Sequence, residues 1–200
     1  MFFNKKNSFD LNDINSIIAA CLRKDRKAQQ ALVEQYLPYG KSICVLYSQN
    51  PMDIDEMVND GFVRVFGNLS KFDSSRSFKS WLRAIFINSC IDHYRKNKSF
   101  SLMSSLDDVM EFELDYQTNV IDDLAAEELL TLIQELTPAY RMVFTLYVVE
   151  GYNHREIADI LRIQEGTSKS NLRDARKRLQ QMIYERYGQH YHKLKIIRSR

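Results

Sequence analysis

The sequence predicts an all-α protein of two small helical domains joined by a flexible acidic linker, with a helix-turn-helix in the C-terminal domain. Good helix formers dominate the 200 residues, and only six Gly and three Pro interrupt them. Apolar residues recur at steps of three and four in both halves of the chain. Between residues 99 and 124 this periodicity fails, and a loop of that length is uncommon inside one compact domain. We therefore expect two domains.

The first half of the chain predicts three helical stretches, over residues 9–47, 54–69 and 78–96. Pro38 at most kinks or restarts the first stretch, and Asn50-Pro51 predicts a loop. A short polar loop is expected at 73–77. The side chains that we expect the third helix to bury are Trp81, Leu82, Ile85 and Ser89.

The second domain is expected to start near Ala125. Thr137-Pro138 predicts a helix start, because the threonine hydroxyl caps a backbone N–H and a proline at the first helical position has no N–H to lose. Gly151 is expected to end that helix, since glycine readily adopts the left-handed conformation.

A helix-turn-helix is predicted directly after Gly151. Asn153 and Glu156 form a capping box, and small Ala158 in the helix that they open allows a second helix to cross closely. Residues 162–166 make a short turn, and Thr167 is expected to cap the second helix. The inner stripe of that helix is Leu172, Ala175, Leu179 and Met182. Its basic outer positions suit the major groove of DNA. An ordinary basic helix of a bundle would carry similar charge, but the cap, the Gly-containing turn and the basic helix together favour the DNA-binding motif.

Charge is unevenly distributed along the chain. Residues 1–98 carry 15 basic and 10 acidic side chains, residues 99–140 carry 10 acidic and no Lys or Arg, and residues 141–200 carry 13 basic and 6 acidic. Two basic modules therefore flank an acidic one, a pattern that suggests contact with a polyanion at both ends. The acidic stretch fits a simple extended spacer or a segment that occupies a positively lined channel.

The stretch EGYNHREIADILRIQEGTSKSNLRDARKRL resembles the C-terminal DNA-binding domain of extracytoplasmic-function (ECF) RNA polymerase sigma factors. In that family the second helix reads the −35 promoter element. The resemblance implies this role for Thr167, Lys169, Ser170, Asn171, Arg173, Arg176 and Lys177. The sequence departs from the family at Arg162, where glycine is usual and a left-handed turn is expected, and at Ser168, where an apolar residue is common.

The face of the 54–69 helix opposite its apolar stripe is acidic and contains one exposed Val. A polar surface with a stray apolar residue is an even alternative to a docking face. The segment DEMVNDGFVRVFGNLSKF resembles the family segment that grips the β′ clamp coiled coil of core polymerase, with Asn59 in place of the usual Gln. The implied polymerase-binding residues are Asp55, Glu56, Asn59, Asp60 and Val63.

Residues 71–98 interleave seven basic side chains with five aromatic ones, a combination that suits single-stranded DNA. Helical spacing gives Trp81 and Phe86 a core role as the alternative. The pattern W-L-x-x-I-x-x-N-x-x-I-D-x-x-R resembles the family region that melts the promoter and captures the −10 element. The implied −10 contacts are Asp73, Ser74, Arg76, Lys79, Arg83, Asn88, Arg95 and Lys96.

The resemblance predicts a region 2 domain at 1–98, an acidic linker at 99–124, a region 4 domain at 125–183 and a basic tail at 184–200. It implies core RNA polymerase (β′ clamp and β flap), promoter DNA and an anti-sigma factor as partners. The alternatives are a free-standing helix-turn-helix regulator and a polymerase- or sigma-binding protein that does not bind DNA.

Several function classes are not supported by the sequence. No Gly-rich phosphate loop and no nucleophile with a plausible base is found, so we expect no catalytic site and no cofactor. Cys90 and His93 lie three apart on a helix, but two ligands do not make a structural zinc site. With no signal peptide, no apolar stretch of about 20 residues and no disulfide pattern, we expect a soluble cytoplasmic protein without membrane insertion.

Overall fold

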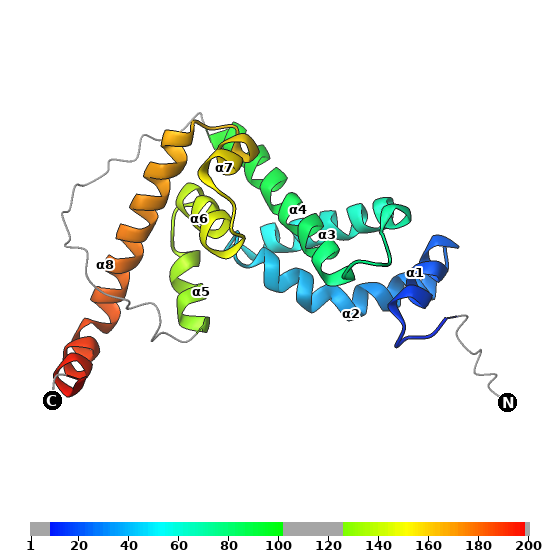
Figure 1. Cartoon of the computed structure of the whole chain (residues 1–200), viewed down its shortest axis with the longest axis horizontal. Coiled ribbons are helices and arrows are strands. Elements are labelled where there is room, and N and C mark those ends of the chain that lie inside the picture. Colours follow the sequence, from blue (N-terminus) through cyan, green and yellow to red (C-terminus); the bar gives the residue numbers. More distant parts are fainter. Residues whose placement is uncertain (1–8, 102–125, 199–200) are drawn as a thin grey trace. The chain divides into compact units, whose positions relative to one another are not determined.

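The computed structural model describes residues 9–101 and 126–198, with side chains over 9–97 and 127–187. The chain divides into two compact units, Met1–His93 and Tyr94–Arg200. All regular elements of the described residues are helical, which confirms the predicted all-α class (Figure 1). Most of the predicted linker, 99–124, lies outside the described residues.

The described residues of the first unit form four α-helices: α1 (Ile14–Leu22), α2 (Arg26–Cys44), α3 (Pro51–Asn68) and α4 (Phe78–Ser101). A single 3-10 turn, Leu69–Lys71, follows α3, and α4 runs across the boundary between the units. The predicted stretch 9–47 is interrupted between α1 and α2. There Lys24 adopts a positive φ of 63°, and the Asp25 carboxylate accepts hydrogen bonds from the N–H groups of Lys27 and Ala28. Pro38 lies inside α2.

Helix α3 begins earlier than predicted. The Asn50 side chain accepts a hydrogen bond from the Met52 N–H at 3.0 Å, and Pro51 occupies the first helical position. The prediction of a loop at Asn50-Pro51 was therefore wrong, because the two residues act as a cap and a helix start.

The core of the first unit is centred on Phe86 of α4, which is fully buried. Its ring lies against two glycines: a Cβ added at Gly61 of α3 would be 2.3 Å from Cε1, and one added at Gly40 of α2 would be 2.6 Å from Cζ. Phe62 meets the same ring edge to face, with centroids 5.3 Å apart. The two glycines thus allow α2 and α3 to approach an aromatic ring at backbone distance.

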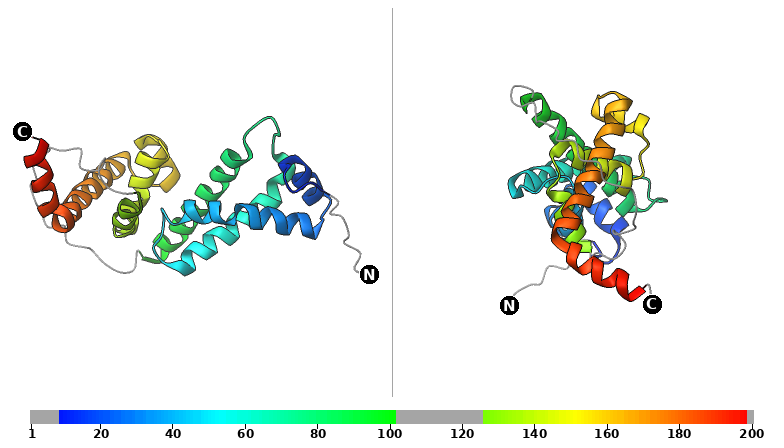
Figure 2. Two further views of the ribbon diagram at one scale, coloured as in Figure 1. Left: turned by 90° about the horizontal axis from the view of Figure 1, so that it is seen from below. Right: turned by 90° about the vertical axis from the view of Figure 1, so that its left-hand side faces the viewer.

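The second unit contains α5 (Ala126–Gln134), α6 (Pro138–Phe144), a π-helical turn (Thr145–Val149), α7 (His154–Leu161) and α8 (Glu165–Arg198). The predicted cap is confirmed, since the Thr137 side chain accepts a hydrogen bond from the Tyr140 N–H. Gly151 has a φ of 78° just after the π-helical turn. Helices α6 and α7 both pack against α8 (Figure 2). The predicted basic tail continues α8 as far as Arg198.

A buried arginine joins α5 to α6. The Arg141 side chain of α6 is almost fully buried and donates hydrogen bonds to three carbonyl oxygens at or just after the C-terminal end of α5: Ile133 at 3.2 Å, Leu136 at 2.8 Å, and Gln134. The guanidinium thus supplies hydrogen bonds to carbonyls where the regular pattern of α5 stops. Its positive charge is also favourable there, at the negative end of the helix dipole.

Candidate functional site

The first helix of the predicted helix-turn-helix is capped as expected. The Glu156 N–H donates to Asn153 Oδ1 at 2.9 Å, and the Asn153 N–H donates to Glu156 Oε2 at 2.8 Å. At its end, Arg162 takes the left-handed conformation with φ 52° and ψ 53°. The turn therefore has the geometry that glycine would favour, and a residue with a Cβ adopts it at an energetic cost.

Helix α8 begins at Glu165, so the prediction that Thr167 caps it was wrong. The Ser168 N–H already donates to the Gln164 carbonyl at 3.1 Å, which places Thr167 inside the first turn. Glu165 is an acidic residue at the positive end of the helix dipole, and Lys169 pairs with it at 2.7 Å. This ion pair and hydrogen bond with Lys169 lower the pKa of Glu165.

The predicted inner stripe of α8 is confirmed, because Leu172, Ala175, Leu179 and Met182 are all buried. The seven predicted −35 residues lie outside this stripe. At 3.6 residues per turn, Lys169, Arg173 and Arg176 share one flank, and Thr167 and Asn171 share the other. Ser170 and Lys177 lie between the flanks, opposite the core. All seven residues therefore lie on the polar side of α8, and the opposite side of the helix packs into the core of the second unit.

A buried polar contact in this motif has no signal in the sequence. Ser168 is fully buried, and its hydroxyl lies 3.0 Å from Nδ1 of His154. At this position, where the family commonly has an apolar residue, Ser168 forms a polar link between α7 and α8. The residues are 14 apart in the chain, so their proximity follows only from the crossing of the two helices.

The predicted polymerase-binding residues share the outer face of α3. Asp55, Glu56, Asn59 and Asp60 are exposed, and Val63 is 70% exposed. Met52, which we did not select from the sequence, is 81% exposed one turn before Asp55. The acidic face thus has an exposed apolar side chain toward each end. Asp55 is also 3.0 Å from the Lys41 ammonium of α2, with both side chains about half exposed.

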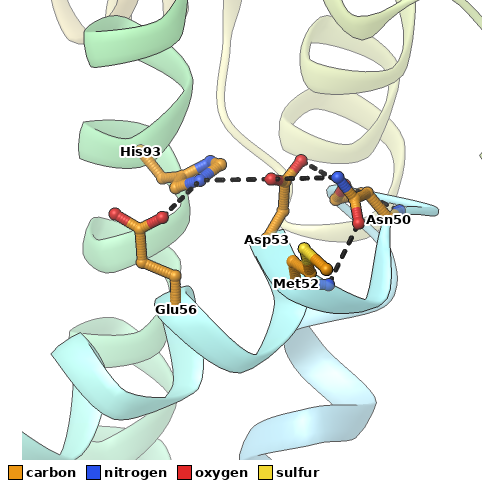
Figure 3. A network of polar contacts seen from close by, with 6 residues as sticks. Asn50, Met52, Asp53, Glu56 and His93 are labelled. Atoms are coloured by element: carbon orange, nitrogen blue, oxygen red, sulfur yellow. Dashed lines mark hydrogen bonds and ion pairs between the residues drawn. The ribbon is translucent and has the colours of Figure 1, made fainter.

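Figure 3 shows how the start of this helix is connected to α4. The His93 side chain is 8% exposed, and its Nε2 lies 3.7 Å from Asp53 Oδ1 and 3.5 Å from Glu56 Oε2. Asp53 also accepts hydrogen bonds from the Ser48 hydroxyl at 3.0 Å and the Asn50 amide at 3.4 Å. The N-terminal turn of α3 is therefore fixed by polar contacts on both sides, and Glu56 lies where this network meets the acidic face.

The predicted −10 loop is held by local contacts. Asp73 accepts hydrogen bonds from the N–H and the hydroxyl of Ser75, which lower the pKa of its carboxyl together with nearby Arg76. The flanking rings of Phe72 and Trp81 lie 5.3 Å apart between centroids, and Phe72 is 5.2 Å from Phe78. Phe86 is fully buried. The core role expected as the alternative is therefore confirmed for Phe86, whereas Trp81 and Phe72 are partly exposed.

The predicted −10 residues of α4 do not form one surface. Lys79 and Arg83 are one turn apart and lie next to the loop. Asn88 and Arg95 lie on the opposite side of the helix, since about 100° separates successive residues. Asp92, part of the same sequence pattern, forms an ion pair with Arg64 of α3 at 2.8 Å, which gives it a structural role.

We found no metal centre among the side chains that the structure describes, which contain no suitable group of three or more His, Cys, Asp or Glu. The Cys90 Sγ faces the Cys44 Sγ at 3.7 Å, in the core of the first unit. Among the described helices, none combines the length and apolar character that a bilayer crossing requires.

Comparison with known proteins relates both units to one family. The Sigma-70 region 2 family matches residues 32–100, and the Sigma-70, region 4 family matches residues 126–179. The chain is 27% identical over 169 residues to the ECF RNA polymerase sigma factor SigW of Bacillus subtilis, covering 80% of this chain and 90% of SigW. It is 26% identical over 167 residues to the ECF RNA polymerase sigma factor SigM of Mycobacterium tuberculosis, covering 84% of this chain and 83% of SigM.

Among solved structures, CnrH in complex with the cytosolic domain of CnrY is similar, with a TM-score of 0.43 and 20% identity over 85% of this chain and 96% of that chain.

The two family regions occur in the predicted order and together match more than half of the chain. A free-standing helix-turn-helix regulator would account only for the second region. The chain therefore belongs to the sigma-70 family of transcription initiation factors, as a member of its ECF group.

Proposed function

We propose that this chain binds core RNA polymerase, directs it to specific promoters and helps to melt them, through the surfaces described above. One observation supports this most directly: an exposed acidic helix face and a helix-turn-helix with an exposed basic helix occur in one chain. In this proposal residues 1–98 are the region 2 domain, 99–124 a linker, 125–183 the region 4 domain and 184–200 a basic tail.

The outer face of α3 is the proposed docking surface for the β′ clamp. Its acidic side chains complement a basic partner helix, and such complementarity steers association. Met52 and Val63 add exposed apolar area, which gives up its contact with water on binding. We also propose that the second unit contacts the β flap, where the half-exposed Val148 and Val149 offer apolar area.

For promoter contacts, we propose that loop 73–77, Lys79 and Arg83 engage the unpaired −10 strand. Asn88, Arg95 and Lys96 contact DNA from the other side of α4. The polar surface of α8 reads the −35 element, with Arg173 and Arg176 as the residues able to make paired hydrogen bonds to guanine. The polymerase performs all the chemistry in this proposal, and the chain acts in the cytoplasm. An anti-sigma factor that covers exposed α3 or α8 would keep it inactive.

Run-off transcription with purified core polymerase tests the proposal. Adding the chain should give transcripts with a defined start from a subset of genomic fragments. If no promoter-specific transcript forms while the chain alone shifts duplex DNA, it is a free-standing regulator. If it binds polymerase without either effect, it is an interaction protein.

The docking surface can be tested separately by reversing charge. The double substitution Asp55→Lys with Asp60→Lys should abolish binding to core polymerase without unfolding the chain, because both residues are exposed. The control is Glu34→Lys, a charge reversal at an exposed position of α2. Retention of the double variant on core polymerase would disprove the docking surface.

A further inference from the structure

Ser168 places a polar group at a fully buried position of the second unit. Its side chain is fully buried in the first turn of α8, and its hydroxyl lies 3.0 Å from Nδ1 of His154, the first residue of α7. A buried hydroxyl without a partner is unfavourable, so this contact matters for the pair of helices. A hydroxyl can donate to Nδ1 only while that nitrogen carries no proton.

The contact continues from His154 to the DNA-facing surface. The His154 ring stacks on the Tyr147 ring, with centroids 4.6 Å apart and an interplanar angle of 26°. The Arg176 guanidinium of α8 lies over the Tyr147 ring, 5.8 Å from its centroid. A continuous series of contacts therefore runs from the buried start of α8, through the π-helical turn, to an exposed arginine two turns further along α8.

The charges around His154 favour a neutral ring, whose Nδ1 can accept a hydrogen bond from the Ser168 hydroxyl. Burial lowers the pKa of His154, and the cations Lys169 and Arg176 lower it further, while Glu165 acts in the opposite direction. The three charged groups that act on this pKa all lie on α8. A neutral ring can stack on Tyr147 without adding a positive charge beside Arg176.

Arg176 differs from the other two cations on its flank of α8. Lys169 forms an ion pair with Glu165 at 2.7 Å, and Arg173 forms one with Asp174 at 3.0 Å. DNA must compete with these carboxylates for the two side chains. A guanidinium held by the face of a ring uses none of its five N–H donors in that contact, so they stay available for a base or a phosphate.

We infer that Tyr147, His154 and Ser168 are positioning residues that hold Arg176 ready to bind the promoter. The inference rests on the proposed function of α8 as the −35 reading helix. If the Arg176 side chain is already held in place, less conformational entropy is lost when it binds DNA. Promoter affinity should therefore depend on Tyr147, His154 and Ser168, although they lie behind the contact surface.

A double-mutant cycle tests this on the holoenzyme, with a promoter duplex from which the wild-type holoenzyme gives a run-off transcript. Tyr147→Phe keeps the ring and should bind like wild type, whereas Tyr147→Leu should weaken binding about two- to fivefold, the range of an exposed cation–π contact. In the Arg176→Ala background, Tyr147→Leu should have no further effect. An equal loss in both backgrounds would show a packing role for Tyr147 and overturn the inference.

Two measurements keep the inference separate from folding and from the proposed function. Ser168→Val restores an apolar side chain and should keep or raise the stability of the second unit, yet weaken promoter binding; unchanged binding counts against the inference. In the free chain, the NMR signal of the Arg176 Nε–H should carry a ring-current shift that Tyr147→Phe retains and Tyr147→Leu removes. If that shift is absent, the positioning role is wrong even where transcription succeeds. If the shift is present but transcription fails, the proposed function is wrong.

Discussion

The contact between Gly61 and Phe86 gives the sharpest test of the packing in the first unit. Replacing Gly61 with Ala adds one methyl group, which would lie 2.3 Å from Cε1 and 2.4 Å from Cδ1 of the Phe86 ring. The shorter distance falls 1.1 Å below the 3.4 Å at which ordinary contacts begin. Either the ring must rotate or α3 must move away from α4. The ring is fully buried and meets Phe62 edge to face, so rotation would disturb a second aromatic contact.

Two effects of opposite sign set the expected magnitude. Overpacking a well-filled core typically costs about 1–3 kcal/mol. Replacing Gly with Ala inside a helix gains up to ~1 kcal/mol, because Ala has the higher helix propensity. We expect the steric effect to win, with a net loss of about 1–2 kcal/mol from the first unit.

The matched control is Gly67→Ala, on the same helix. A Cβ added at Gly67 meets no heavy atom within 4 Å, so only the gain from helix propensity applies. The chain has one tryptophan, Trp81, which lies in the first unit and whose fluorescence reports on that unit alone. In urea titrations, Gly61→Ala should lower the midpoint and Gly67→Ala should raise it slightly, with similar slopes.

The packing argument fails if Gly61→Ala raises the midpoint as much as Gly67→Ala does. A second variant separates a steric cause from any other. Adding Phe86→Leu to Gly61→Ala should cost less than Phe86→Leu costs by itself, because the smaller side chain leaves room for the added methyl group. Independent, additive losses would mean that the methyl group and the ring do not meet.

Three further predictions concern the second unit. Arg173→Ala should cost about 1–3 kcal/mol at one base pair of the −35 element if Arg173 reads a base, but should weaken binding evenly across sequences if it contacts phosphate; a panel of singly substituted duplexes distinguishes the two. Arg162→Gly should stabilise the unit by up to ~1 kcal/mol, because glycine adopts the left-handed conformation without a Cβ clash; native-state hydrogen exchange in α7 would show slower exchange. Burial and the nearby cations lower the pKa of His154 from its usual 6.5, so the unfolded chain takes up a proton first as the pH falls. The contribution of His154 to stability should therefore be complete above pH 6.5 and decline as the pH falls through the folded-state pKa. Hydrogen exchange in α7 would follow this decline between pH 7.5 and pH 5.5, and His154→Gln should make the measured stability less dependent on pH in that range.

Features with a local cause were predictable from the sequence. The Thr137 cap and the Asn153–Glu156 capping box involve residues at most three apart, and the structure forms both. The left-handed turn at Arg162 was expected because the resemblance places a glycine there, and the observed φ of 52° agrees. Local spacing is sufficient in these cases because the hydrogen bonds close within one helical turn.

Features that depend on how helices cross were missed. The Ser168–His154 contact joins two helices, and nothing near either residue indicates that the other is its partner. The break between α1 and α2 was missed because Lys24 is an unusual residue for a positive φ. The exposure of Met52 follows from a helix start at Pro51, which we had interpreted as a loop. The first two errors have the same origin, since a one-dimensional pattern contains no information on a crossing angle or on a strained residue. The third was a misreading of a local signal, because Asn50-Pro51 caps and starts a helix as Thr137-Pro138 does.

The buried Arg141 has a consequence for how this protein tolerates changes in length. Because one guanidinium holds three carbonyls at the end of α5, the chain between Ile133 and Arg141 forms a corner of fixed length. An inserted or deleted residue within that corner would move the carbonyls out of reach of the guanidinium. Insertions before residue 126 leave the corner intact. Among related sequences, natural variation in length should therefore accumulate ahead of α5 and be absent between α5 and α6.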